Sequence, residues 1–227
     1  MQPDIDEVTN QSFEIPNDWT FKNKLVADAF DNHVRESLPW YDLVSGAVAH
    51  VARHYLPPNG TMYDIGASTG NIGKLLDESL TARQAQLISI ESAPEMAEHF
   101  QAQGILEVAD ATTYEYKNFD VATLFLVLMF LTMEQRKKLI TKLLSKCRKG
   151  GAIIIVDKIE TPANYIGTIN RRLTLAGKVA TGVPHEKIIA KELSLAGIQR
   201  PLQLQELPAN TQTFFQFGEF AGFIIEG

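Results

Sequence analysis

A glycine-rich turn after the first apolar strand is the sequence feature that most constrains the fold. Residues 61–65 read TMYDI, a strand-like run, and the chain then passes through Gly66, Gly70 and Gly73 into a helical pattern. Glycine lets the backbone turn sharply and approach a ligand without a Cβ atom in the way. In a parallel α/β sheet, such a turn at the carboxyl end of the first strand builds the ligand site. The sequence therefore predicts an α/β fold with a ligand loop here.

The rest of the chain repeats the alternation of strand and helix. This alternation predicts right-handed crossovers and a parallel sheet with helices on both faces. Two late strands, separated by Pro208 and Asn210, are expected to form an antiparallel C-terminal hairpin. We thus predict a Rossmann-like, seven-stranded, mostly parallel sheet. Strands are expected near 61–65, 85–91, 104–109, 119–130, 152–159, 201–207 and 213–225, and helices near 21–37, 41–55, 71–80, 94–102, 134–148, 163–182 and 185–196.

Composition narrows the function and the domain organisation. Residues 1–20 contain five acidic and no basic side chains, and we expect them to form an acidic, mobile arm. The remaining residues, 21–227, are expected to be a single domain, because no linker long enough to divide them is present. Within it we expect an N-terminal helical cap at 21–56 and a substrate lid at 160–185.

Charge and cysteine content exclude several classes of protein. The 27 acidic residues exceed the 21 basic ones, which gives no direct signal for nucleic-acid binding, since phosphate backbones reward clustered Lys and Arg. The lone cysteine, Cys147, excludes a disulfide framework and a cysteine-rich metal site, and fits a reducing compartment. No apolar run approaches the roughly 20 residues of a membrane span. We expect a cytoplasmic protein that acts on a small molecule, without a metal or a membrane partner; a homodimer is compatible with these features.

The spacing of the loop argues against two common nucleotide sites. A dinucleotide fingerprint that starts at Gly66 would need glycines where Ser68 and Asn71 stand. A P-loop would need Gly-Lys-Ser/Thr, which is absent. The observed pattern is Asp64-x-Gly66-x-x-x-Gly70, and its acidic residue suits a ligand that carries an ammonium group. A nicotinamide enzyme and a tight turn without a ligand remain alternatives.

The loop resembles the first motif of class I S-adenosylmethionine-dependent methyltransferases, and later features follow in the family's order. Glu91, at the end of a strand, stands where the family's acidic residue binds both ribose hydroxyls, and a carboxylate can accept both hydrogen bonds. Asp110 stands where a side chain meets the adenine amino group. The resemblance implies S-adenosyl-L-methionine as the cofactor and a methyltransferase-like domain. The cofactor-binding residues that it implies are Tyr41, Asp64, Gly66, Ala67, Ser68, Gly70, Glu91, Ser92, Asp110, Ala111, Phe125 and Leu126.

Each acidic residue also has a simpler reading. Glu91 could cap the next helix, Asp110 could be a plain turn residue, and Asp64 could hold the backbone amides of the loop. Their joint occurrence in the family's order favours the cofactor site.

Two flanking segments resemble one branch of the family, the carboxy-S-adenosylmethionine synthases, which make a carboxylated cofactor from prephenate. They are residues 21–44 and 213–227, and in this branch a tyrosine at the position of Tyr41 covers the cofactor. The branch's carboxylate-binding arginine is replaced by Glu192, which would repel a carboxylate. An asparagine of the branch is replaced by Phe125. We therefore predict a methyltransferase that acts on a small-molecule acceptor; a synthase-like transferase and a non-catalytic cofactor-binding partner subunit are the alternatives.

Candidate groups for catalysis and acceptor binding fall late in the chain. His185 stands at an expected helix start, which would expose its imidazole as a general base, although a lone histidine is more often structural. Asp157 and Glu160 are further candidates near the expected mouth of the site. The predicted acceptor contacts are Tyr165, Arg171 and Arg172.

Overall fold

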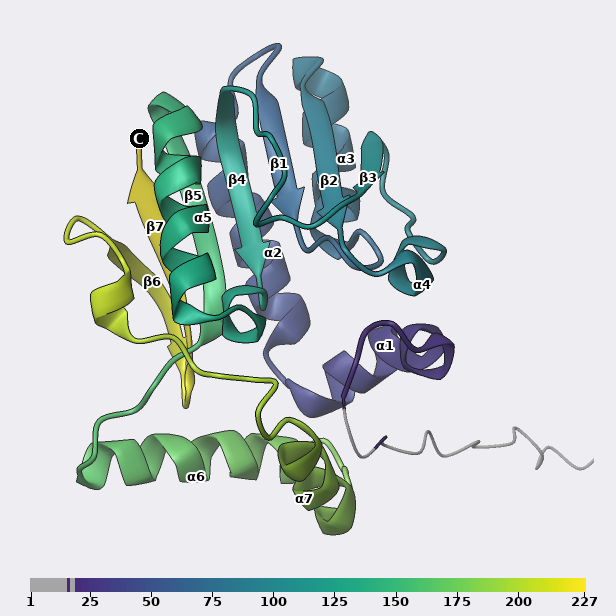
Figure 1. The fold of residues 1–227 in the computed structure, drawn as a ribbon, viewed down its shortest axis with the longest axis vertical. Coiled ribbons are helices and arrows are strands. Elements are labelled where there is room, and N and C mark those ends of the chain that lie inside the picture. The colour runs from purple at the N-terminus through teal and green to yellow at the C-terminus, as the bar shows by residue number, and fades with distance from the viewer. Residues whose placement is uncertain (1–15, 17–18) are drawn as a thin grey trace, which may run out of the picture.

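The framework of the protein is a seven-stranded sheet, seen in a computed structural model that describes residue 16 and residues 19–227 (Figure 1). The strand order is β3-β2-β1-β4-β5-β7-β6. Pairing is parallel from β3 to β5, and β7 runs antiparallel to both β5 and β6. This sheet confirms the predicted fold class. The strands are β1 (Thr61–Ile65), β2 (Gln86–Glu91), β3 (Ile105–Val108), β4 (Phe119–Phe125), β5 (Cys147–Lys158), β6 (Gln212–Phe217) and β7 (Phe220–Glu226).

Helices cover both faces of the sheet and the carboxyl ends of its parallel strands. In Figure 1, α1, α6 and α7 lie beyond those strand ends. Among the described helices, none is long and apolar enough to cross a membrane. Most of the arm expected at 1–20 lies outside the described residues. The helices are α1 (Lys24–Ser37), α2 (Tyr41–Tyr55), α3 (Asn71–Arg83), α4 (Pro94–Ala97), α5 (Met133–Lys146), α6 (Tyr165–Ala180) and α7 (His185–Ser194), with the 3-10 turns η1 (Leu128–Phe130) and η2 (Leu204–Glu206).

Successive strand residues serve opposite faces of the sheet, as the two-residue period of a strand requires. Met62 of β1 is buried in the cluster that also holds apolar residues of α2 and α3. Its neighbour Tyr63 is buried in the second cluster, which also holds Leu139 and Leu143 of α5. The central strands are therefore apolar on both faces, which leaves their ends as the place for polar groups.

The C-terminal hairpin lies later in the sequence than predicted. Both of its strands, β6 and β7, fall at 212–226, whereas 201–207 contributes only the isolated bridge of Leu202 to Ile159 and the turn η2. The turn between the strands holds Gly218, whose φ of +56° favours glycine. The prediction used Pro208 and Asn210 as the turn, but these residues precede the hairpin.

A buried arginine joins two loops that flank the carboxyl ends of the strands. Arg136 of α5 is fully buried, and its Nε donates to the carbonyls of Leu128 and Leu131 at 2.7 and 3.0 Å. Its Nη1 donates to the carbonyl of Pro201 at 3.2 Å and to the carboxylate of Glu206 at 3.0 Å. Arg136 thereby connects the loop after β4 to the segment that precedes the hairpin.

Replacement of this arginine by methionine should strongly destabilise the fold. Arg136→Met leaves Glu206 as an unpaired, nearly buried carboxylate, so we expect the free energy of unfolding to fall by about 3–5 kcal/mol. Urea unfolding followed by circular dichroism measures the loss. Lys137→Met, an exposed change on the same helix, should alter the free energy by less than about 0.5 kcal/mol. Similar small effects of both variants would contradict the structural role of Arg136.

Candidate functional site

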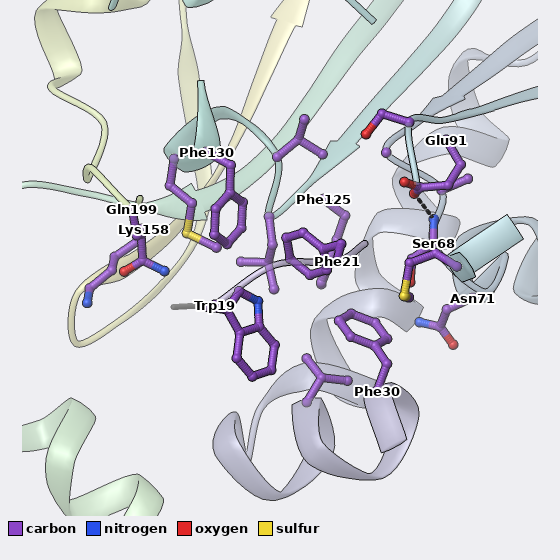
Figure 2. Close-up of a pocket in the computed structure, with 18 of the residues that line it drawn as sticks. Trp19, Phe21, Phe30, Ser68, Asn71, Glu91, Phe125, Phe130, Lys158 and Gln199 are labelled. Atoms are coloured by element: carbon purple, nitrogen blue, oxygen red, sulfur yellow. Dashed lines mark hydrogen bonds between the residues drawn. The ribbon is translucent and has the colours of Figure 1, made fainter. Parts of the chain in front are cut away.

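A cavity of about 590 Å³ opens at the carboxyl ends of β1 and β4. The chain crosses to opposite sides of β1 at this point, and α/β proteins bind ligands in the crevice that such a reversal leaves. The glycine loop forms one end of the cavity, and α1, the start of α2, α6 and α7 enclose the rest. Figure 2 shows Ser68 and Glu91 at one end, Lys158 and Gln199 at the other, and aromatic rings between them.

The glycine loop turns against the end of β2. The N–H groups of Gly66 and Ala67 both donate to the carbonyl of Ile90, at 2.8 and 3.0 Å. The φ of Gly66 is +69°, and a Cβ atom there would lie 2.5 Å from a methyl group of Val127, so both the conformation and the space require glycine. Gly70 has a φ of +83° and forms the N-cap of α3, outside the lining of the cavity. The loop thus presents its backbone to the cavity between these two glycines.

Asp64, the fourth residue of β1, has an unused acceptor atom beside the cavity. Its Oδ1 accepts from the hydroxyl of Thr123 at 2.7 Å, whereas its buried Oδ2 has no hydrogen-bond partner within the described residues. Burial, reinforced by the charge of Glu91 and opposed by the Thr123 bond, raises the pKa of Asp64 to about 6. A ligand ammonium group would satisfy this oxygen.

Glu91 and Asp110 are held in place by backbone donors. Glu91 accepts from the N–H of Ser68 at 2.8 Å and from the N–H of Ala93, the N-cap of α4, at 2.9 Å. Asp110 accepts from the N–H and hydroxyl of Thr112 in a local turn. The simpler roles are therefore present, yet both side chains also line the cavity. Each Glu91 oxygen accepts one of these bonds and has a second acceptor position, and both Asp110 bonds fall on Oδ1, which leaves Oδ2 for a ligand. We call Asp64, Glu91 and Asp110 the acidic end.

The structure brings together eleven of the twelve predicted cofactor residues, and Gly70 is the exception. Tyr41 and Phe125 form an edge-to-face pair, with ring centroids 5.4 Å apart. Burial raises the pKa of the Tyr41 phenol, so its ring stays neutral. The predicted cofactor residues that line the cavity are Tyr41, Asp64, Gly66, Ala67, Ser68, Glu91, Ser92, Asp110, Ala111, Phe125 and Leu126.

The predicted catalytic and acceptor residues lie elsewhere. His185, Tyr165, Arg171 and Arg172 are exposed, and none lines the cavity. They occupy exposed positions of α6 and the start of α7. Helical periodicity in the sequence does not show which face of these helices turns toward the cavity.

Asp157 does not line the cavity either. It is fully buried and accepts from the N–H groups of Leu128 and Met129, at 2.7 and 3.2 Å, so it fixes η1. Burial, opposed by its backbone hydrogen bonds, raises its pKa to about 7. Among the described residues, no group of three or more His, Cys, Asp and Glu side chains could hold a metal ion.

Sequence reasoning missed an aromatic wall and one histidine. The wall consists of Trp19, Phe21, Phe30 and Phe130, and all four line the cavity. His33 of α1 lines it too; burial and the charges of nearby lysines lower its pKa to about 4. The helical spacing of α1 predicts an apolar face but not the element that this face covers.

The opposite end of the cavity is basic. Lys158 at the end of β5 and Lys178 of α6 both approach the Glu192 carboxylate, with N···O distances of 3.6 and 2.6 Å. Although burial acts in the other direction, these two cations lower the pKa of Glu192. We expected Glu192 to repel a carboxylate, but that expectation is wrong as stated, because Lys158 and Lys178 offset its negative charge. The sequence did not indicate that these two lysines lie beside Glu192. We call Lys158, Lys178 and the neighbouring Lys191 the basic end.

Comparison with known proteins agrees with this geometry. A family model described as a methyltransferase domain matches residues 63–155. The chain therefore contains a methyltransferase domain with the class I S-adenosylmethionine-dependent fold. The predicted family and cofactor are thus confirmed.

Relatives match over most of the chain. It is 29% identical over 224 residues to a carboxy-S-adenosyl-L-methionine synthase of Staphylococcus epidermidis, which covers 92% of this chain and 97% of the relative. The plantazolicin methyltransferase BpumL aligns with a TM-score of 0.60 at 14% identity, over 88% of each chain. An O-methyltransferase of Nostoc punctiforme aligns with a TM-score of 0.59 at 14% identity, over 90% of this chain and 60% of that one. The two structural likenesses concern the fold.

Affinity for S-adenosylhomocysteine should depend on the ionisation of Asp64. With a pKa of about 6 in the free protein, Asp64 is protonated at pH 5, and a protonated carboxyl cannot pair with the ligand ammonium. We expect the affinity to fall about tenfold from pH 7 to pH 5. His33, with a pKa of about 4, stays neutral over this range. Calorimetric titration at both pH values measures the effect, and Asp64→Asn should bind more weakly without this pH dependence. Equal affinities of the native protein at the two pH values would refute the assignment.

Glu91→Ala should lower the affinity for S-adenosylhomocysteine at least tenfold, about 1.4 kcal/mol. The variant removes the expected ribose acceptor and also the acceptor that holds the Ser68 N–H of the loop. Calorimetry at pH 7 measures the change, after urea unfolding has shown that the variant is folded. Glu98→Ala, at an exposed residue outside the cavity, is the control. An unchanged affinity in folded Glu91→Ala would remove the ribose role.

Proposed function

We propose that this methyltransferase transfers the methyl group of S-adenosylmethionine to a small-molecule acceptor bound in the same cavity. The observation that carries the proposal is the continuity of the cavity, from the acidic end, past Tyr41 and Phe125, to the aromatic wall and the basic end. The acidic end suits the cofactor, and the remainder offers a second compartment for the acceptor.

The side chains at the acidic end fit the proposed cofactor. S-adenosylmethionine supplies a methyl group on a sulfonium for in-line displacement. In our proposal the free Asp64 oxygen accepts from its ammonium group, Glu91 binds the ribose hydroxyls and Asp110 meets the adenine amino group. The rings of Tyr41 and Phe125 provide aromatic surface for the cationic sulfonium through cation–π attraction.

The contribution of the chain to catalysis is positioning and exclusion of water. Trp19 is 4% exposed, and its backbone N–H donates to the carbonyl of Ser194 of α7 at 3.1 Å. Phe21 packs edge to face on Phe130 with centroids 5.1 Å apart. These contacts close one side of the cavity and favour a dry, oriented reaction. His33 lies on the cavity wall, with its Nε2 3.5 Å from the Ser37 hydroxyl, and is the proposed base for an acceptor that must lose a proton.

Carboxy-S-adenosylmethionine synthesis is the second candidate. The Staphylococcus epidermidis relative carries that name, and the lysines of the basic end offer positive charge near the position of the missing arginine. A non-catalytic partner subunit is the third, because residues 124–131, at the end of β4 and in the turn that follows it, are all apolar and supply no catalytic group. The cytoplasm is the proposed location, supported by the single cysteine, which is half-buried with its pKa raised by burial to about 11.

Cofactor binding and turnover test the proposal together. We expect micromolar binding of S-adenosylmethionine and S-adenosylhomocysteine but not of NADH in calorimetric titrations. Incubation with S-adenosylmethionine and a panel of small acceptors should release S-adenosylhomocysteine and yield a methylated product by mass spectrometry. A prephenate-dependent product that is heavier by one carboxylate would favour the synthase reading instead. Cofactor binding without any product would favour the partner subunit, and failure to bind either adenosyl compound would overturn the proposal.

A further inference from the structure

The cavity separates charge along its length. The acidic end lies at the glycine loop, and the basic end lies where β5, α6 and α7 meet. Figure 2 shows the rings of Phe125, Phe130 and Trp19 between the Glu91 and Lys158 side chains. Ligands of opposite charge would therefore be favoured at the two ends.

Lys158 and Lys178 are unusually well buried for lysines. Each residue is 8% exposed, and each approaches a different oxygen of the Glu192 carboxylate. Burial of an ammonium is costly unless an anion compensates it. Two ammonium groups share one carboxylate here, so one positive charge remains in the wall of the cavity.

Burial, with a smaller contribution from nearby lysine charges, lowers the pKa values of two neighbouring groups. The pKa of His33 falls to about 4 through burial and the charges of Lys191, Lys178 and Lys187. Burial and the charge of Lys178 lower the pKa of Lys191 to about 5, so Lys191 is neutral at pH 7. The excess charge at the basic end therefore resides on Lys158 and Lys178.

We propose that Lys158 and Lys178 form an anion subsite for the methyl acceptor, which Glu192 occupies as an internal carboxylate until the acceptor binds. The proposal rests on the proposed function, because it places the acceptor in the cofactor's cavity. The Glu192 side chain is 40% exposed, so it can leave the lysines, whose own side chains are 10% exposed and stay in place.

The aromatic wall defines the rest of the acceptor. Trp19, Phe21 and Phe130 line the cavity beside the subsite and offer apolar surface. The acceptor class is therefore an organic anion with an apolar or aromatic body, such as an aryl carboxylate. A neutral compound of the same shape would bind against the aromatic wall, but it would not displace Glu192 from Lys158 and Lys178.

The alternative is a purely structural role for the Lys158–Glu192–Lys178 group, and it predicts the opposite effect of one substitution. If Glu192 only neutralises the lysines, its loss leaves them unpaired, weakens the fold and improves no ligand. If Glu192 competes with the acceptor, its loss strengthens binding of an organic anion. Glu192→Gln keeps the size of the side chain and removes its charge, so it separates the two.

The experiment compares 3-phenylpropanoate with the neutral 3-phenylpropanamide by calorimetry on the full chain saturated with S-adenosylhomocysteine. We expect the acid to bind at least tenfold more tightly than the amide. Lys158→Met and Lys178→Met should each lower the affinity for the acid at least tenfold and leave the affinities for the amide and S-adenosylhomocysteine unchanged. Glu192→Gln should raise the affinity for the acid at least threefold.

The controls keep the outcomes separate. Lys137→Met removes an exposed lysine outside the cavity and should change nothing, and Lys178→Arg keeps the charge and the preference for the acid if Lys178→Met does not fold. Equal binding of acid and amide, or weaker binding of the acid by folded Glu192→Gln, would overturn the subsite. Failure of the native protein to bind S-adenosylhomocysteine would instead overturn the proposed function. In that case the comparison of acid and amide on the protein without S-adenosylhomocysteine would still test the subsite.

Discussion

The pairing of β1 with β2 on one side and with β4 on the other is the constraint on which the rest of the structure depends. The connections that leave β1 and β4 turn to opposite sides, so no crossover helix fills the crevice at their carboxyl ends. The glycine loop and Asp64 belong to β1 and its turn, and they therefore face this crevice. The helices α1, α6 and α7 then enclose it as a cavity (Figure 1).

Because the charged side chains of this cavity are buried, their electrostatic interactions with ligands are strong. Asp64 has one oxygen paired with Thr123 and one without a partner among the described residues, an arrangement whose energetic cost a cationic ligand would offset. At the other end of the cavity the imbalance has the opposite sign, because Lys158 and Lys178 bring two positive charges to the single negative charge of Glu192. Opposite charges interact more strongly away from water, so this separation can orient two different ligands in one cavity.

The sequence predicted the framework well where the signals are local. The strands near 61–65 and 86–91 and the loop between β1 and α3 follow from apolar runs and glycine spacing. The hairpin was misplaced, because Pro208 and Asn210 are strong turn signals, whereas the actual turn at Gly218 depends on packing beside Thr174 of α6. His185 stood out as exposed, yet the histidine at the cavity is His33 on a helix from the other end of the chain.

By itself, the sequence determined the α/β class, the glycine loop and the acidic residues at the strand ends. These features depend on backbone preferences and on residues adjacent in the chain, which any fold of this class keeps together. Only the tertiary structure decided that Lys158, Lys178 and Glu192 meet, since they come from β5, α6 and α7. Their contact depends on how three separate elements pack, and side-chain spacing along the sequence carries no information about that packing.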